Sequence, residues 1–307
     1  MSAAIRGVVP PVVTPLTEDR ELDRESLERS LERMLDAGVH GLFALGSSGE
    51  VVFSTDARRD EILSATVQAV AGRVPVLAGV IDMQTERVIE HTRRAADLGA
   101  DAVVATAPFY ALGGEREMEE HFRAIAASTE LPVYAYDIPV CVHRKLGVEL
   151  LVRLGAEGVI AGVKDSSGDD VSFRQLVIRN REEDAGLALL TGHEVVVDGA
   201  YLAGADGSVP GLGNVDPAGY VRQWDAAQRG DWQAVSEEQD RLTRLMRIAA
   251  ADVTATGFGA GVGSFKTALR ELGVFTTNQM PRPVAAQGEE AARRVREILT
   301  AEGMLGA

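Results

Sequence analysis

The chain has 307 residues, of which 46% are hydrophobic and 25% are charged. This length and composition allow a substantial buried core, which excludes disordered and fibrous architectures. Lysine and arginine total 31 against 46 acidic residues, so the formal net charge is −15. Because an acidic surface repels phosphate backbones and anionic headgroups, we expect neither a nucleic-acid partner nor a membrane partner.

The sequence contains no obvious membrane, secretion or metal-binding signal. No apolar run reaches about 18 residues, and residues 1–7 lack the basic and apolar regions of a signal peptide, so we expect a cytoplasmic protein. The single cysteine, Cys141, excludes an internal disulfide and a cysteine-rich metal site. The five histidines never fall at close metal-ligand spacing. We therefore expect no metal and no cofactor.

Short apolar runs alternate with amphipathic segments along the first two thirds of the chain. The runs, rich in β-branched residues, predict eight buried strands at 8–14, 41–45, 75–79, 102–105, 132–136, 159–164, 187–191 and 207–209. Helical periodicity between most of them predicts helices at 24–36, 58–70, 86–98, 115–127 and 216–229. Strand and helix therefore alternate.

The connections between these segments support the same architecture. Several helices end in a glycine followed at once by a strand, at Gly38, Gly99, Gly155 and Gly204. Glycine supplies the left-handed residue that closes a helix, so these are helix-to-strand loops. Eight such units with strands covered on both faces predict an α/β fold, a closed (β/α)8 TIM barrel, although a doubly wound open sheet has the same local pattern.

After the eighth strand the pattern is helical only, near 232–250, 264–272 and 288–300. We therefore expect a barrel domain over 1–230 and a C-terminal helical extension over 231–307. The glycine-rich segment 257–263 follows no strand and lacks the dinucleotide-binding spacing, so we interpret it as a flexible loop before a helix.

Lys164 is the sharpest catalytic candidate. It ends the predicted strand 159–164, and active sites of barrels lie at the C-terminal ends of the strands. The chain has only three lysines against 28 arginines. A guanidinium would serve a structural ion pair, but only a primary amine can lose its proton and act as a nucleophile. The alternative is a lysine paired with Asp165 or another carboxylate.

Other polar residues follow neighbouring strands. Tyr136 and Tyr110 carry phenols that can pass protons between an amine and a substrate oxygen, with simple packing as the alternative. Segment 46–50 offers hydroxyl and backbone N–H groups that can converge on a carboxylate, although it can equally be an ordinary turn. Cys141 is interpreted as a pocket-lining residue, since nothing places a base beside its thiol.

Three motifs in order identify a resemblance. Gly-Ser-Ser-Gly-Glu stands at 46–50, Tyr-Asp-Ile-Pro at 136–139 and Gly-Val-Lys-Asp-Ser-Ser-Gly-Asp at 162–169. Together they resemble the dihydrodipicolinate synthase and N-acetylneuraminate lyase family of Schiff-base barrels. The likeness covers nearly the whole chain and makes the barrel prediction firmer.

The resemblance implies roles for individual residues. Lys164 would form an imine with the keto carbon of pyruvate or of a 2-keto acid, and Tyr136 would shuttle protons. Ser47 would link Tyr136 to Tyr110 of a neighbouring subunit, while Ser48 would help hold the pyruvyl carboxylate. The same resemblance implies a homotetramer built as a dimer of dimers.

Other positions implied by the family concern substrate binding, and several depart from its pattern. Val209 matches the family's apolar wall behind pyruvate. Cys141 stands where synthase-type members place an arginine that clamps the carboxylate of the aldehyde substrate, and a cysteine cannot make that pair. Asp137 replaces a common asparagine. After Gly192 only Glu194 represents the acidic pair that recognises sugar hydroxyls in the sialic acid lyase branch.

These features together predict an imine-forming lyase or aldolase that handles pyruvate or a 2-keto-3-deoxy acid and an aldehyde. The alternatives are 4-hydroxy-tetrahydrodipicolinate synthase, which joins pyruvate to aspartate semialdehyde, and a Schiff-base dehydratase of the same family. A barrel that binds a keto acid without turnover is a further alternative, because fold alone does not confer chemistry. His143 and Arg144 are the only nearby cations that could replace the missing arginine.

Overall fold

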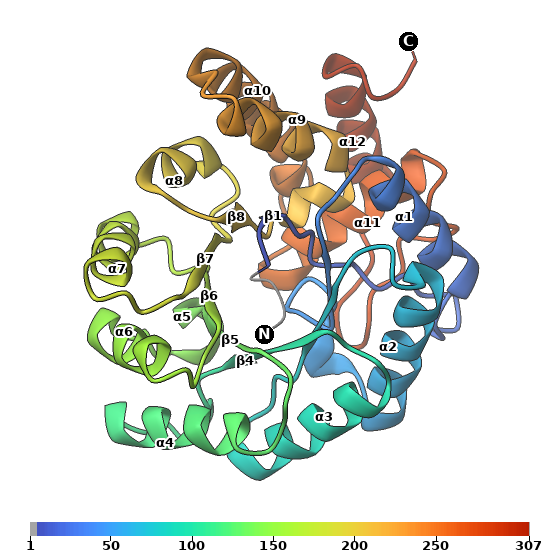
Figure 1. Cartoon of the computed structure of the whole chain (residues 1–307). Coiled ribbons are helices and arrows are strands. Elements are labelled where there is room, and N and C mark those ends of the chain that lie inside the picture. Colours follow the sequence, from blue (N-terminus) through green and yellow to red (C-terminus); the bar gives the residue numbers. More distant parts are fainter. Residues whose placement is uncertain (1–4, 307) are drawn as a thin grey trace.

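The computed structural model describes residues 5–306, which form a ring of helices around eight strands (Figure 1). The strands hydrogen-bond in the order β1-β8-β7-β6-β5-β4-β3-β2, and every neighbouring pair is parallel. Their bounds are β1 Gly7–Val8, β2 Leu42–Ala44, β3 Val76–Gly79, β4 Ala102–Thr106, β5 Val133–Asp137, β6 Gly162–Asp165, β7 Ala188–Thr191 and β8 Gly207–Ser208. All eight predicted strands are present.

The sheet closes on itself between the segment after β1 and the β2 strand. Pro11 and Phe43 form a parallel bridge, and the Phe43 amide donates to the Pro10 carbonyl at 3.0 Å. The Val12 amide in turn donates to the Phe43 carbonyl at 2.9 Å. Closure removes the free edges that an open sheet would expose. The barrel prediction is confirmed, and the open-sheet alternative is excluded.

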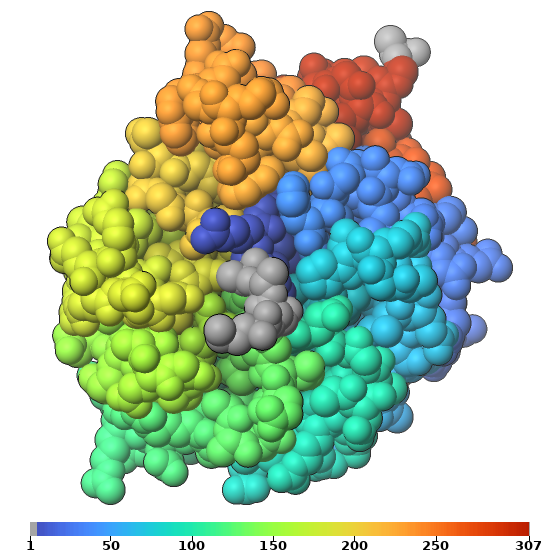
Figure 2. Space-filling view, in the orientation of Figure 1, coloured from blue at the N-terminus to red at the C-terminus, as the bar shows by residue number. Residues whose placement is uncertain are grey.

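Helices cover the outside of the barrel, and consecutive units succeed one another around the ring, as the colour sequence of the surface shows (Figure 2). Their bounds are α1 Arg24–Asp36, α2 Asp56–Val70, α3 Thr85–Asp97, α4 Glu115–Ala126, α5 Pro139–Val142, α6 Val148–Ala156, α7 Asp170–Glu182, α8 Val197–Ala203 and α9 Pro217–Gln228. The five predicted helices are confirmed with small shifts at their ends. The helices predicted to end at Gly155 and Gly204 are present as α6 and α8, although α6 continues one residue past Gly155. The α5 and α7 helices lie outside the ranges predicted as helices.

Local sequence explains why these helices form where they do. The α1 helix begins after Asp23, whose carboxylate accepts the Ser26 amide hydrogen and so caps the first turn. Leu27, Leu31 and Met34 recur at helical spacing and are fully buried. The α1 helix therefore has both a start signal and an apolar face to pack against the barrel.

The predicted C-terminal helices are present as α10 Trp232–Leu245, α11 Gly261–Glu271 and α12 Glu289–Ala301, and short 3₁₀ turns lie at η1 Val51–Phe53, η2 Gly211–Asn214, η3 Met246–Ala250 and η4 Gly257–Gly259. The predicted loop at 257–263 is thus partly wrong, because it contains η4 and the start of α11. The Phe258 ring packs edge-on against the Phe53 ring, with 5.4 Å between centroids, which gives η4 an apolar anchor.

The expected boundary at residue 230 falls in the short connection between α9 and α10. Contacts nevertheless join the two parts: the Arg20 side chain donates to the Met280 carbonyl at 3.1 Å, and that of Arg29 to the Val274 carbonyl at 3.0 Å. The division into a barrel over 1–230 and an extension over 231–307 stays a proposal. No helix among residues 5–306 is long and apolar enough to cross a membrane.

Candidate active site

Lys164 and Tyr136 lie side by side at the carboxyl ends of β6 and β5. The two residues are register partners on adjacent parallel strands, so their side chains project from the same face of the sheet. Both are buried, with 5% and 3% of their surface exposed. The Lys164 Nζ lies 4.0 Å from the centroid of the Tyr136 ring and 4.8 Å from that of Phe43. Two aromatic faces therefore surround the amine.

Ser47 adds a hydroxyl to this pair. Its Oγ lies 3.4 Å from the Tyr136 hydroxyl, which is the long end of a hydrogen bond. The loop that carries Ser47 follows β2 and needs its glycines. A Cβ at Gly46 would stand 2.6 Å from the Phe43 ring, and one at Gly49 would stand 3.1 Å from backbone atoms. The compact turn places Ser47 beside Tyr136, and Ser48 follows it, partly buried.

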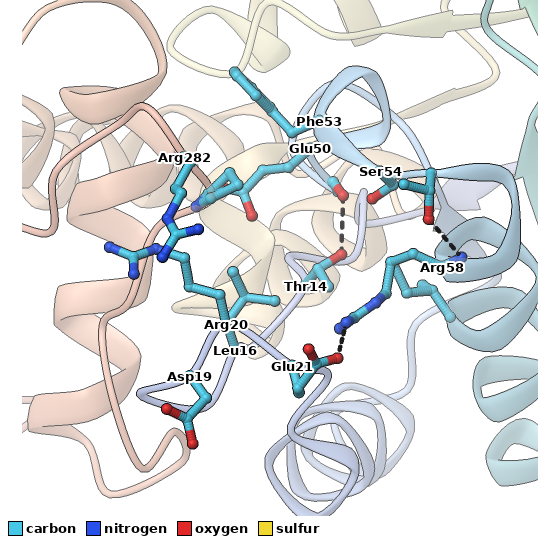
Figure 3. Close-up of a pocket in the computed structure, with 14 residues that line it drawn as sticks. Thr14, Leu16, Asp19, Arg20, Glu21, Glu50, Phe53, Ser54, Arg58 and Arg282 are labelled. Atoms are coloured by element: carbon cyan, nitrogen blue, oxygen red, sulfur yellow. Dashed lines mark hydrogen bonds and ion pairs between the residues drawn. The ribbon is translucent and has the colours of Figure 1, made fainter.

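Glu50 fixes the end of the same loop through an ion pair with a C-terminal helix. Its side chain is 2% exposed, and the buried Lys266 ammonium of α11 donates to its carboxylate at 2.6 Å. Burial raises the pKa of Glu50, and the Lys266 charge acts against that shift. The Thr14 hydroxyl also donates to the Gly49 carbonyl at 2.9 Å (Figure 3). The loop is therefore held by contacts to the N-terminal segment and to the C-terminal helices.

A cavity of about 310 Å³ lies beside Glu50. Figure 3 shows Arg20 and Arg282 on one side of it and Arg58, paired with Glu21, on the other. None of the predicted site residues lines this cavity. The candidate active site is thus the group of residues at the strand ends and not this cavity.

Tyr110 does not join the other candidates within one chain. It follows β4 with 90% of its surface exposed, and its backbone is in the left-handed region, with φ of 75°. No hydrogen bond links it to Ser47 or Tyr136 within residues 5–306. The expectation that Tyr110 acts from a neighbouring subunit stays a prediction.

Three substrate-binding candidates lie just past β7 and β8. Val209 is buried directly after β8, and its amide donates to the Thr191 carbonyl at 2.8 Å. Gly192 follows β7, where an added Cβ would stand 2.0 Å from the Ser166 Oγ, so a larger residue would displace the Ser166 hydroxyl. Both residues, together with Glu194, belong to the same end of the barrel as Lys164.

Glu194 has the most perturbed carboxylate of the site candidates. Its Oε2 accepts the Leu212 amide hydrogen at 2.7 Å. Burial raises the pKa of Glu194 to about 7, while that amide and the positive charge of Lys164 act in the opposite direction. The carboxyl group therefore changes charge near neutral pH, within electrostatic reach of Lys164.

Cys141 lies on α5, and His143 and Arg144 follow it; the resemblance predicts an arginine clamp at the position of Cys141. Cys141 is exposed, yet nearby protein atoms raise the pKa of its thiol by desolvation, with the Lys164 charge opposing. His143 and Arg144 are also exposed. Neither makes a side-chain hydrogen bond or ion pair within residues 5–306, so no contact directs either of them into the site.

Sequence reasoning missed two supporting ion pairs, those of Lys266 with Glu50 and of Lys145 with Asp137. The scarcity of lysine was a signal for all three lysines, although it was applied to Lys164 alone. Among residues 5–306 no group of three or more His, Cys, Asp or Glu side chains could hold a metal ion.

Comparisons with known proteins agree on one family. Residues 4–302 match the model of the "Dihydrodipicolinate synthetase family". An uncharacterised DapA-like lyase of Halobacterium salinarum is 35% identical over 84% of each chain, and a 4-hydroxy-tetrahydrodipicolinate synthase of Phenylobacterium zucineum is 31% identical over 87% of each chain. The structure of YagE, a prophage protein from E. coli K12 in complex with pyruvate, superposes with a TM-score of 0.92 at 26% identity, covering 99% of this chain and all of that one. The family resemblance is confirmed, and the chain belongs to the dihydrodipicolinate synthetase family.

Proposed function

We propose that this protein is an imine-forming, class I lyase or aldolase that acts on pyruvate or a 2-keto-3-deoxy acid and reversibly joins or cleaves a carbon–carbon bond with an aldehyde. The observation that carries the proposal is the Lys164 amine, buried against the Tyr136 ring at 4.0 Å, with the Ser47 hydroxyl in reach of the Tyr136 phenol. Membership of a family of lyases supports it. So does the pyruvate complex described for the related YagE.

The chemistry needs few groups. The Lys164 amine adds to the keto carbon, water leaves, and an imine forms. The Tyr136 phenol is the nearest group that can give a proton to the departing oxygen and take one back, and Ser47 extends that path. The imine withdraws electrons from the adjacent carbon, which then loses a proton and attacks an aldehyde. The reverse sequence cleaves the bond, and water finally releases the keto acid.

The remaining residues would hold the substrate. Ser48 and neighbouring backbone amides would bind the keto-acid carboxylate, with the buried Val209 as an apolar wall. Glu194, beyond Gly192, would accept a hydrogen bond from a substrate hydroxyl. We propose that a tetramer supplies Tyr110 from a neighbouring subunit.

Synthesis of 4-hydroxy-tetrahydrodipicolinate from pyruvate and aspartate semialdehyde is a second candidate function. It is favoured by the relative of that name at 31% identity. Cys141 weighs against it, because the clamp for the second carboxylate of that reaction is absent from this position.

Borohydride reduction in the presence of pyruvate tests the proposal. We expect one pyruvyl-derived mass per chain on the peptide that contains Lys164, because the imine carbon is reduced in place. The Lys164→Arg variant should show no trapping although it keeps the charge.

Labelling at Lys145 or Lys266, or no labelling at all, would contradict the assignment. Mass spectrometry of digested protein distinguishes the three lysines. A screen of aldehydes then follows, and trapping without turnover of any of them would favour a keto-acid-binding protein over an enzyme.

A further inference from the structure

Two buried carboxylates stand directly next to the proposed catalytic pair. Asp137 and Asp165 are register partners at the ends of β5 and β6, one residue beyond Tyr136 and Lys164. Because successive side chains of a strand point to opposite faces, the two carboxylates lie on the other face of the sheet from the Lys164 amine. Asp137 has no exposed surface and Asp165 almost none. Two negatively charged carboxylates therefore lie together in the protein interior.

A single cation serves both carboxylates. The Lys145 ammonium forms an ion pair with Asp137 and lies 3.7 Å from the Asp165 Oδ2. Lys145 is 31% exposed at its side chain, so it closes the solvent side of the cluster. The Asp137 Oδ1 also accepts the Leu146 amide hydrogen at 3.0 Å. The chain on either side of Lys145 is thereby tied to the end of β5.

The cluster also reaches the loops that follow both strands. The Asp165 Oδ1 accepts the Ser167 amide hydrogen at 2.8 Å and its hydroxyl hydrogen at 2.7 Å. The α5 turn, which carries Cys141, lies in the connection between Asp137 and Lys145. The ion pair between Asp137 and Lys145 thus joins the two ends of this connection. Loss of the pair would release the turn as well as the strand end.

The electrostatics of Asp137 and Asp165 explain why these two buried carboxylates need a cation beside them. Burial raises the pKa of Asp137, Lys145 and the Leu146 amide act against that shift, and Asp165 adds to it. Breaking a buried ion pair by removing one partner leaves an uncompensated charge, which costs far more than a surface pair contributes. Asp137 carries a charge at a position where a neutral amide would need no cation.

We propose that Lys145 is a positioning residue of the active site, which acts through Asp137 and Asp165 to hold Tyr136 and Lys164 in place and to fix the α5 turn. This inference rests on the proposed function for its effect on imine formation. Its structural part concerns the placement of Cys141 and is independent of any substrate.

The net charge of the cluster makes the proposal testable. With both carboxylates ionised, two carboxylates and one ammonium sum to −1, and Lys145→Met leaves −2 one residue beyond the Tyr136–Lys164 pair, so the pH dependence of trapping should change. Lys145→Arg and the double variant Asp137→Asn/Lys145→Met both restore −1, whereas Asp137→Asn alone gives 0. The other ionisable groups around Lys164, namely Tyr136 on β5, Glu194 after β7 and Cys141 on α5, are the same in every variant.

The first measurement is the rate of pyruvate trapping by borohydride as a function of pH. We expect the acidic limb of the profile to move to higher pH in Lys145→Met, by about half a unit or more. Lys145→Arg and the double variant should keep the wild-type limb, and Asp137→Asn should move it to lower pH. Arg174→Met is the matched control, since Arg174 is an exposed cation on α7 without an ion pair among residues 5–306.

The second measurement needs no substrate and uses the single cysteine as a reporter. Cys141 should react with a disulfide reagent several-fold faster in Lys145→Met than in the wild type, because the turn is no longer tied down. Lys145→Arg should restore the slower rate. If Lys145→Met does not fold, the pH profiles and thiol reactivities of Asp137→Asn and Lys145→Arg are compared with those of the wild type instead.

An unchanged pH limb together with unchanged thiol reactivity in Lys145→Met would overturn the inference. So would a double variant as impaired in trapping as Lys145→Met, because Lys145 would then act without Asp137. Absence of trapping in the wild type would instead refute the proposed function, and the thiol series would still decide whether Lys145 positions the turn.

Discussion

Cys141 sets the polarity of the wall that would face the second substrate. The residue is exposed on the α5 turn and is close enough to Lys164 for their charges to interact. A substrate carboxylate placed there would lose hydration without gaining a charged partner, at a cost on the order of several kcal/mol. Within residues 5–306, His143 and Arg144 make no side-chain hydrogen bond or ion pair that would direct them toward this wall.

We therefore predict that aspartate semialdehyde is a poor acceptor and that a neutral or hydroxylated aldehyde is better. Cys141→Arg should shift the ratio toward the semialdehyde, because a guanidinium can pair with its carboxylate. The measurement is kcat/KM for the two classes of aldehyde. A tenfold wild-type preference for the semialdehyde, about 1.4 kcal/mol, would show that the clamp lies elsewhere and favour the synthase function.

Glu194 gives a prediction for pH dependence. Burial raises its pKa in the folded protein from 4.5 to about 7. Because the folded state holds the proton more tightly than the unfolded chain, this group lowers stability as pH rises from about 4.5 to about 7, and the loss is complete above that. Glu194→Gln cannot ionise. Its Tm relative to wild type should rise between pH 5 and pH 8 in thermal unfolding.

Glu182→Gln provides the control for that series, since Glu182 is exposed on α7 and makes no side-chain hydrogen bond or ion pair among the described residues. Its Tm difference from the wild type should not depend on pH. A difference for Glu194→Gln that is equally flat would mean that the carboxylate is solvated and that its pKa is ordinary.

At the scale of elements, the seam between β1 and β8 is a tightly packed part of the barrel. Gly7 and Gly207 are register partners, and a Cβ at Gly207 would stand 2.2 Å from the Gly7 carbonyl oxygen. Backbone atoms cannot give way there as the end of a flexible side chain can. The closure of the barrel therefore depends on a residue without a side chain.

Gly207→Ala should lower the free energy of unfolding by about 3 kcal/mol or more, because strands must separate to admit a methyl group. Gly199→Ala is the matched control: it lies in α8, has no neighbour within 4 Å of an added Cβ, and should be neutral or about 0.5–1 kcal/mol more stable. Denaturant unfolding measures both. Equal effects of the two substitutions would show that the seam has room.

At the scale of the whole molecule, the role proposed for Tyr110 would make the site dependent on assembly. A large aromatic residue with 90% exposure and a left-handed backbone is unusual in a subunit that stands alone. Leu112 and Met83 are also exposed apolar residues. These observations fit a surface that a second copy covers, and the family resemblance supplies the expected tetramer.

We expect light scattering on the purified protein to give the mass of a tetramer. Tyr110→Phe should slow turnover because it removes the phenol of the proton path, with Tm and oligomeric mass unchanged. A fully active monomer would contradict this expectation, and so would a Tyr110→Phe variant with wild-type turnover.

Much of the fold was predictable because its signals are local. The period of apolar residues and the cap at Asp23 define α1, whose predicted and observed bounds agree. The prediction of Lys164 and Tyr136 also used local information, namely the end of an apolar run and a rare residue type. The family motifs then assigned their roles. Each of these signals lies within a few residues of the chain.

The periodicity of the sequence gives no residue range for α5 and α8 because their periodic signals are weak. The α5 and α8 helices have only four and seven residues, which is too short for a clear helical period. The glycines of segment 257–263 favour a flexible loop, yet the packing of Phe258 on Phe53 favours a 3₁₀ turn there. Tertiary contact outweighed local preference at these places.

The tertiary structure alone decided which distant groups meet. Lys266 and Glu50 are 216 residues apart, and nothing local marks either as the partner of the other. The place of Lys145 between Asp137 and Asp165 depends on the register of β5 with β6. The pKa of Glu194 depends on enclosure by the segment after β8. Burial and ion pairing depend on the packing of the whole chain, whereas periodicity and caps are properties of one segment. For this physical reason the sequence by itself determined most of the elements and predicted the candidate reactive residues, and only the tertiary structure decided the contacts that support them.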